Sequence, residues 1–187
     1  NDTIIKDKGI FEMTHYLATH PEVGVLGGQL RNENGTLQAS TGNFYTLWPA
    51  FLLLIGGQKL GLLDKSPKQI KKVDWVKGGL LMIRKEVFKR LGGFDEKIFM
   101  YTEDMELCYR AASSGYAVYF YPNITVLHKE HGSTNKTFAI VNIYKNLLYF
   151  YTKHRSKTEY RYLKWLLMTK ARILIWSGKI LKKKYMI

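Results

Sequence analysis

The sequence is short of cysteine and has no long apolar run. Cys108 is its only cysteine, which excludes an internal disulfide and a thiolate zinc cluster and fits a reducing, cytosolic setting. Because Cys108 falls on the apolar side of a predicted helix, we expect a small buried hydrophobe rather than a nucleophile. The longest apolar run, residues 47–55, is too short to span a bilayer, and the first residues lack the parts of a secretory signal. We therefore expect neither a transmembrane helix nor secretion.

Acidic residues are also scarce, and the excess of positive charge lies at one end. The chain has 29 Lys and Arg against 15 Asp and Glu, a formal charge of +14. From residue 145 onward there are twelve Lys and Arg, interleaved with Tyr and Trp, against the single acid Glu159. This composition predicts an anionic surface as partner, and such a helix can lie in a membrane interface. The alternative is a solvated basic face with an apolar stripe toward the core.

The chain does contain enough apolar residues for one folded domain. Of its 187 residues, 46% are hydrophobic and 14% aromatic, so a sizeable core can be buried. We expect helices at residues 7–20, 85–91 and 103–114, and strands at residues 23–30, 75–84, 117–122 and 125–128. Two further helices are predicted after residue 138, separated near residues 155–158. Residues 39–72 have no clean period and predict a loop-rich insertion with one short helix near Leu52.

The acidic pair Glu103-Asp104 opens the predicted helix 103–114, after a Gly-Gly turn and an aromatic segment. Thr102 is the predicted N-cap, and acids in the first helical turn interact favourably with the positive end of the helix dipole. We therefore expect Asp104 to stay ionised and to be held still, as a carboxylate that can act as a base. The alternative is that Glu103 and Asp104 are merely solvent-exposed acidic residues at the start of the helix.

Three segments together resemble the inverting family 2 glycosyltransferases with a GT-A fold, in particular the rhamnosyltransferase-like members that build bacterial surface polysaccharides. They are VDWVKGGLLMIRKEVF (residues 73–88), GGFDEKIFMYTEDMELCYRAASSGY (residues 92–116) and YPNITVLHKEHGST (residues 121–134). The resemblance implies an α/β chain: a partial GT-A fold over residues 1–137, with a mixed sheet flanked by helices, and a basic amphipathic helical appendage over residues 138–187.

The order of elements is similar to the second, acceptor-side half of a GT-A domain. Asn1-Asp2-Thr3 resembles the end of the family's metal-binding acidic motif, which would make Asp2 its last carboxylate. The resemblance then implies that the nucleotide-binding strands precede residue 1 and that this piece is inactive alone. The alternative for Asp2 is a terminal residue without a role.

The implied reaction moves a sugar from a nucleoside-diphosphate sugar to an acceptor hydroxyl, with inversion at the anomeric carbon. Asp104 is the predicted base, and Glu103 is the second choice or helps to position the acceptor. Mg²⁺ or Mn²⁺ would stabilise the leaving diphosphate, with Asp2 and His128 as candidate ligands. His131 is a less favoured alternative to His128.

Four further residues are predicted near the donor or the acceptor. Gly78 and Gly79 match the strand that passes beneath the donor in the family, where a missing side chain permits close approach. Trp75 would wall a pocket, or else simply pack the strand. Asp95 would orient an acceptor hydroxyl, or else cap the turn that contains it.

The implied partners are a nucleotide-sugar donor, a glycan or lipid-linked acceptor, and an anionic membrane surface bound through residues 145–184. This combination predicts a cytoplasmic protein, peripheral at the inner face of the cell membrane. The competing hypothesis is a non-catalytic basic module that binds nucleic acid or another anionic polymer through its tail. An acidic pair beside a glycine-rich strand has no use in such a module, so no nucleic acid is expected.

Overall fold

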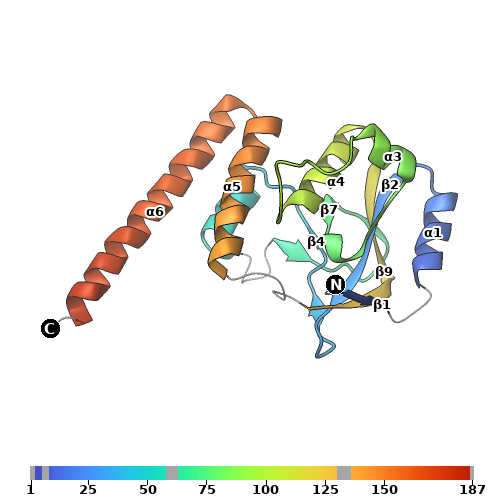
Figure 1. Ribbon diagram of the computed structural model, residues 1–187, viewed down its shortest axis with the longest axis horizontal. Helices are drawn as coiled ribbons and strands as arrows, with labels where there is room; N and C mark the ends of the chain where they lie inside the picture. The colour runs from blue at the N-terminus through green and yellow to red at the C-terminus, as the bar shows by residue number, and fades with distance from the viewer. Residues whose placement is uncertain (1–2, 6–8, 58–62, 130–135, 186–187) are drawn as a thin grey trace.

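The computed structural model describes residues 3–5, 9–57, 63–129 and 136–185, and they form a curled sheet flanked by helices (Figure 1). The helices are α1 (Gly9–Thr19), α2 (Leu47–Leu54), α3 (Lys85–Arg90), α4 (Glu103–Ser113), α5 (Lys136–His154) and α6 (Lys157–Tyr185), with a 3-10 turn η2 at Gly78–Leu80. The strands are β1 (Thr3–Ile5), β2 (Val23–Arg31), β3 (Leu37–Gln38), β4 (Thr41–Gly42), β5 (Asp64–Lys65), β6 (Lys71–Lys72), β7 (Trp75–Val76), β8 (Leu81–Ile83) and β9 (Ala117–His128).

The main sheet is built on the parallel pair β2 and β9. β8 and β3 lie antiparallel to β2, while β1 and β6 lie antiparallel to β9. Strand β2 is buried along nearly its whole length, which is typical of a central strand covered on both faces and matches a sequence that is apolar or glycine except for Gln29 and the terminal Arg31. A second, small sheet has the order β5-β4-β7.

Strand β9 joins the two short strands that the sequence predicted. Gly28 pairs with Tyr121 and Gln29 pairs with Thr125, so the register shifts where β9 carries Pro122. Proline has no N–H to donate to the ladder, and an irregularity there lets one strand continue past it. The prediction of two separate strands was therefore wrong.

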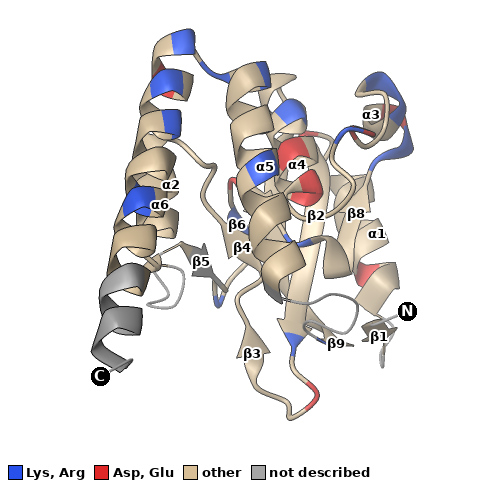
Figure 2. Ribbon diagram, turned by 60° about the vertical axis from the view of Figure 1, so that its left-hand side comes forward, with Lys and Arg blue, Asp and Glu red and all other residues tan. Residues whose placement is uncertain are grey.

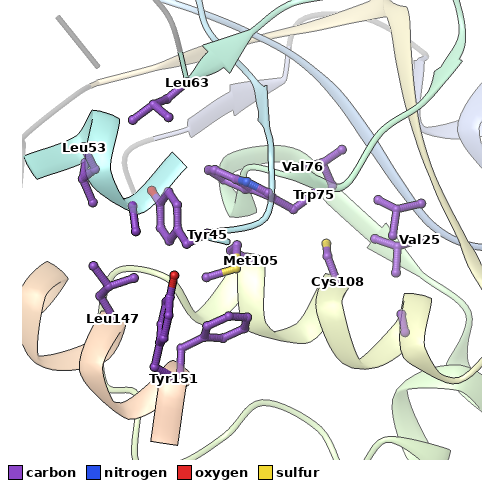
Figure 3. Packing of buried hydrophobic residues seen from close by; sticks show 14 of the residues in the cluster. Val25, Tyr45, Leu53, Leu63, Trp75, Val76, Met105, Cys108, Leu147 and Tyr151 are labelled. Atoms are coloured by element: carbon purple, nitrogen blue, oxygen red, sulfur yellow. The ribbon is translucent and has the colours of Figure 1, made fainter. Parts of the chain in front are cut away.

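Two apolar clusters lie on opposite faces of this sheet. Met13 and Leu17 of α1 pack with Leu26, Leu30 and other residues of one face. On the other face the larger cluster gathers residues of β2, β7, β9 and the helices, several of which Figure 3 shows at close range. Its fully described members include Val25, Trp75, Val76, Met105, Cys108, Phe120, Leu147, Phe150, Tyr151 and Leu163.

Helix α5 is part of this core although it lies in the basic tail. Leu147, Phe150 and Tyr151 are fully buried, at the spacing that brings side chains to one face of a helix. Figure 3 shows Leu147 and Tyr151 beside Met105 of α4 and Tyr45. Helix α6 runs back along α5 and contributes Leu163, but most of its later residues are exposed (Figure 1). The packing of the tail therefore changes within α6 rather than at residue 138.

A buried carboxylate joins α5 to α4. Glu106 is fully buried, and its oxygens accept hydrogen bonds from Arg110 at 2.8 and 2.9 Å, from Lys153 at 2.7 Å and from His154 at 3.0 Å. Burial alone would raise the pKa of Glu106, but the bonds from His154, Lys153 and Arg110 outweigh it and lower the pKa to about 2. The carboxylate is therefore ionised and held by cations from two helices.

Glu106→Gln should lower the free energy of unfolding at pH 7 by about 3 kcal/mol, because it leaves buried cations without their counter-charge. The stabilisation from Glu106 is complete above its ordinary pKa of 4.5 and is lost as the pH falls through its folded pKa of about 2. Urea unfolding should thus show a difference in free energy of unfolding between wild type and Glu106→Gln that is smaller at about pH 3 than at pH 7. Glu96→Gln, at an exposed position, is the control. An equal difference between the two proteins at both pH values would contradict a lowered pKa for Glu106.

Candidate active site

The Gly-Gly turn before the acidic pair is tied to α4. Gly92 and Gly93 have φ of 75° and 78°, in the left-handed region that only glycine adopts without strain. The Arg110 guanidinium donates to the carbonyl of Leu91 at 2.6 Å and to that of Gly93 at 2.8 Å. The same guanidinium binds Glu106, so the turn and the helix are held by one side chain.

The backbone bends sharply just before α4. Tyr101 and Thr102 have φ of 67° and 70°, and they are the residues other than glycine with positive φ in the described ranges. Thr102 occupies the N-cap position in a left-handed conformation, and its side chain makes no capping hydrogen bond. Its buried Oγ1 has no hydrogen-bond partner among the described residues. The prediction of Thr102 as the N-cap is therefore confirmed in position, but the side chain does not make the capping hydrogen bond that its residue type suggested.

Asp104 lies against the 3-10 turn η2, which separates β7 from β8. The prediction of a single strand over residues 75–84 was therefore wrong, because the chain turns at Gly78–Leu80. Its Oδ2 accepts a hydrogen bond from the backbone N–H of Gly78 at 2.9 Å, and its Oδ1 accepts one from Met105 N–H at 2.7 Å. Burial nevertheless raises the pKa of Asp104 above its ordinary value, against these two bonds and the charge of Lys77. Burial thus opposes the ionised form that the helix start was expected to favour. That Asp104 stays ionised remains a prediction.

Glu103 shares this environment. Its Oε2 is buried and finds no hydrogen-bond partner in the part of the chain that the structure describes. Burial first, and then the neighbouring charge of Asp104, raise the pKa of Glu103 to about 7. Two adjacent carboxyls in such a setting do not ionise independently, so the pair holds a proton near neutral pH.

His128 completes the same edge of the site. A Cβ added at Gly79 would lie 3.3 Å from His128 Cδ2 and 3.2 Å from Leu30 Cδ1, so the imidazole packs directly on the Gly79 backbone. His128 Nδ1 lies 2.9 Å from Gln38 Oε1, and Gln38 Nε2 donates to the His128 carbonyl at 2.7 Å. Asp104, Gly78, Gly79 and His128 are thereby brought together from three segments of the chain.

The metal prediction is only partly covered by the described residues. Asp2 and His131 lie outside them, while Thr3 pairs with His128 across β1 and β9. Within residues 3–5, 9–57, 63–129 and 136–185, no group of three or more His, Cys, Asp or Glu could hold a metal ion. The contact of His128 Nδ1 with Gln38 Oε1 orients the imidazole, as partners of this kind do for metal-binding histidines. The fit therefore rests on this single ligand.

Trp75 and Asp95 lie in surroundings that favour their structural alternatives. Trp75 is 5% exposed, packs beside Gly42 and donates from Nε1 to the carbonyl of Asn43 at 3.1 Å. Asp95 accepts hydrogen bonds from the Lys97 backbone at 3.0 Å, from Tyr149 at 2.8 Å and from Lys153 at 2.7 Å. Burial would raise the pKa of Asp95, but these bonds lower it to about 2. A role for either residue in ligand binding stays a prediction.

Cys108 is fully buried in the larger core cluster, as the sequence predicted. Burial raises the pKa of its thiol to about 12, with a smaller contribution in the same direction from the charge of Asp104. A thiol with such a pKa is not a nucleophile at neutral pH, so Cys108 acts as a small apolar residue.

Residues 1–145, more than three quarters of the chain, match the glycosyltransferase-like family 2. The chain belongs to this family. The curled mixed sheet with flanking helices agrees with the GT-A-like α/β fold that the sequence predicted, and the rhamnosyltransferase-like resemblance is confirmed by the relatives described next.

Curated relatives that are similar to this chain carry glycan-assembly names. N-acetylglucosaminyl-diphospho-decaprenol L-rhamnosyltransferase of Mycobacterium tuberculosis is 27% identical over 128 residues, which cover 62% of this chain and 40% of that protein. Rhamnosyltransferase WbbL of Escherichia coli is 34% identical over 86 residues, covering 46% of this chain and 33% of the relative. Low-salt glycan biosynthesis hexosyltransferase Agl10 of Haloferax volcanii is 40% identical over 57 residues, covering 29% and 19%. The chain thus spans at most 40% of the length of these relatives.

The titration of the acidic pair can be followed without any substrate. Glu103 should titrate at about pH 7 in carboxyl ¹³C NMR, because burial and the charge of Asp104 both oppose its ionisation. Asp104→Asn removes that charge and should move the Glu103 titration to lower pH, though not to its ordinary value, since burial remains. Glu96 provides an exposed reference signal in the same spectra. A Glu103 titration that Asp104→Asn leaves in place would show that the two carboxyls do not interact.

Proposed function

We propose that this chain is the acceptor-side part of an inverting glycosyltransferase, which moves a sugar from a nucleoside-diphosphate donor to a hydroxyl of a glycan or lipid-linked acceptor. The observation that carries the proposal is the position of the Asp104 carboxylate, next to Glu103 in the chain. It accepts a hydrogen bond from the Gly78 backbone, and the following residue, Gly79, packs against His128. Family membership supports this enzyme over the basic binding module that the composition also allowed.

Asp104 acts as the general base. An alcohol becomes a good nucleophile only as its proton leaves, and a carboxylate within hydrogen-bond reach accepts that proton in the transition state. The new bond to the anomeric carbon forms as the bond to the diphosphate breaks, and a single displacement of this kind inverts the centre. A pKa raised toward the working pH makes Asp104 a stronger base than a solvated aspartate.

Two hydrogen bonds fix where this base points. The N–H groups of Gly78 and Met105 hold one oxygen each, so the carboxylate does not rotate freely. Gly78 itself is exposed, and the nearest atoms that a Cβ there would meet are those of Asp104, at 3.7 Å or more. Packing within the protein therefore does not require a glycine at this position, which supports close approach of a ligand as its reason.

A divalent cation, Mg²⁺ or Mn²⁺, would be held by His128 together with Asp2. When bound, it stabilises the negative charge that gathers on the leaving diphosphate. His128 is oriented for this purpose by its contact with Gln38.

The substrate class is proposed from the names of the relatives. Two of them are rhamnosyltransferases, and one name includes an acceptor built on a diphospho-decaprenol lipid. By analogy, we propose that this chain also acts on a deoxysugar or hexose donor and a lipid-linked acceptor. An enzyme that works on such an acceptor has to reach the membrane surface.

Helix α6 supports that requirement. Ile173, Leu174, Ile175 and Trp176 are consecutive and each 58 to 67% exposed, a run that in a globular protein marks an interaction surface. Lys and Arg recur along the same helix (Figure 2). Exposed apolar and aromatic residues among cations favour the interface of an anionic membrane over a merely solvated face. None of the described helices is long and apolar enough to cross a bilayer.

Asp104→Asn should lower the rate of sugar transfer by about 10²- to 10⁴-fold, while binding of the donor is retained. The measurement is release of the nucleoside diphosphate by the complete polypeptide, with Mn²⁺ and a panel of uridine and deoxythymidine diphosphate sugars. Asp74→Asn is a matched control, because among the described residues the carboxylate of this neighbouring aspartate accepts its hydrogen bond from the Phe44 backbone and not from Gly78. Equal rates for wild type and Asp104→Asn would remove Asp104 from its role.

Vesicles of phosphatidylcholine with phosphatidylglycerol should co-sediment the protein, whereas vesicles of phosphatidylcholine alone should do so weakly, and added salt should weaken binding. Trp176→Glu should reduce partitioning about tenfold, the loss expected for withdrawing one large apolar side chain. Phe11→Glu is the matched control, since Phe11 is 75% exposed on α1, beyond the sheet from α6. Binding that does not depend on anionic lipid would favour a solvated basic face instead.

A further inference from the structure

The acidic pair depends on a backbone bend that is unfavourable in itself. Tyr101 and Thr102, directly before Glu103, both have left-handed backbone conformations that side chains with a Cβ disfavour. Such a conformation persists only where the surrounding structure holds it in place. Thr102 does not hold itself, since its side chain makes no capping bond and its buried Oγ1 has no partner among the described residues.

One side chain from α5 binds this bend. Asn146 is 3% exposed, and its side-chain amide donates to the carbonyl of Met100 at 2.8 Å and to that of Tyr101 at 2.7 Å. Both N–H groups of the amide are therefore used on consecutive peptide units at the start of the bend. A buried amide with both donors satisfied by one stretch of backbone leaves that stretch little freedom.

Asn146 is itself held in place by the packing of the residues that follow it on α5. The next residue, Leu147, is fully buried in the larger core cluster, and one turn further on Phe150 is buried beside it. Two turns further on, Lys153 binds Glu106 of α4 at 2.7 Å. Helix α5 is thus anchored to α4 at one point by charge and to the residues before α4 by the Asn146 amide.

We propose that Asn146 is a positioning residue for the reaction: it holds the left-handed bend at residues 101–102 and so sets where α4 begins and where Glu103 and Asp104 point. The inference rests on the proposed function, since it concerns the aim of the proposed base. Asn146 does not touch the reacting atoms, and its effect on transfer passes through the bend.

The matched pair of variants is Asn146→Leu and Asn142→Leu. Both make the same exchange on the same helix, one turn apart. In the described part of the chain, however, the Asn142 amide donates to Phe138 of its own helix, at 2.9 Å, and not to the bend. Asn146→Leu should lower kcat for transfer by about 10- to 100-fold, with the KM for the donor changed less than about threefold. The reason is that a misplaced Asp104 carboxylate affects the transition state more than it affects donor binding. Asn142→Leu should leave both constants near those of the wild type.

A double-mutant cycle with Thr102→Gly separates positioning from general loss of stability. Glycine adopts a φ near +70° without steric cost, so a bend with glycine at residue 102 needs Asn146 less. The loss of kcat caused by Asn146→Leu should therefore be several-fold smaller in the Thr102→Gly background. An equal loss in both backgrounds, or an equal loss for Asn142→Leu, would overturn the proposal.

Two further arms keep the outcomes distinct. Asp104→Asn is assayed beside the cycle. If Asp104→Asn retains transfer activity, the proposed base is wrong. If Asp104→Asn loses transfer activity while Asn146→Leu has no effect, only the positioning role of Asn146 is refuted. Should Asn146→Leu not fold, Asn146→Gln takes its place in the cycle, because it keeps the amide but moves it by one methylene. A smaller loss of kcat for Asn146→Gln in the Thr102→Gly background then supports the inference, and an equal loss in both backgrounds overturns it.

Discussion

The ionised carboxylate of Glu106 is the constraint on which the arrangement of the helices depends. A fully buried charge is tolerated only where cations and hydrogen bonds replace water, and Glu106 receives them from Arg110 of its own helix and from Lys153 and His154 of α5. Arg110 also holds the Gly-Gly turn, and Lys153 also binds Asp95. One buried charge thus ties α4, α5 and the loop between α3 and α4 into a single body.

This scaffold places two further carboxyls in a very different setting. Glu106 is surrounded by cations and has a lowered pKa, whereas Glu103 and Asp104, less than one turn away, are partly buried with few donors and have raised pKa values. The contrast comes from the direction in which each side chain leaves the helix. Glu106 faces α5, while Asp104 faces Gly78. Less than one helical turn therefore separates a structural carboxylate from the pair to which we assign the proton transfer in our proposal.

Local sequence was sufficient for much of the fold and for the core of the candidate site. The apolar period of residues 103–114 predicted α4, and the largely apolar run of residues 23–30 predicted β2. The acidic pair at the start of an amphipathic helix directed attention to Asp104. Gln38 and Asn146 were missed, because each reaches its partner across a large separation in the chain and neither forms a local motif. Thr102 lies at the predicted N-cap position, but its residue type did not reveal that its backbone is left-handed and that its side chain makes no capping hydrogen bond.

What the sequence by itself determined is the order and type of the elements, the place of the acidic pair at a helix start and, through its three motif segments, membership of the family. These follow from the period of apolar side chains and from residues that lie near one another in the chain. Only the tertiary structure decided that α5 belongs to the core, that the acidic pair is desolvated, and that Asp104 meets Gly78. Burial and charge pairing depend on segments that are far apart in sequence, so no local pattern specifies them.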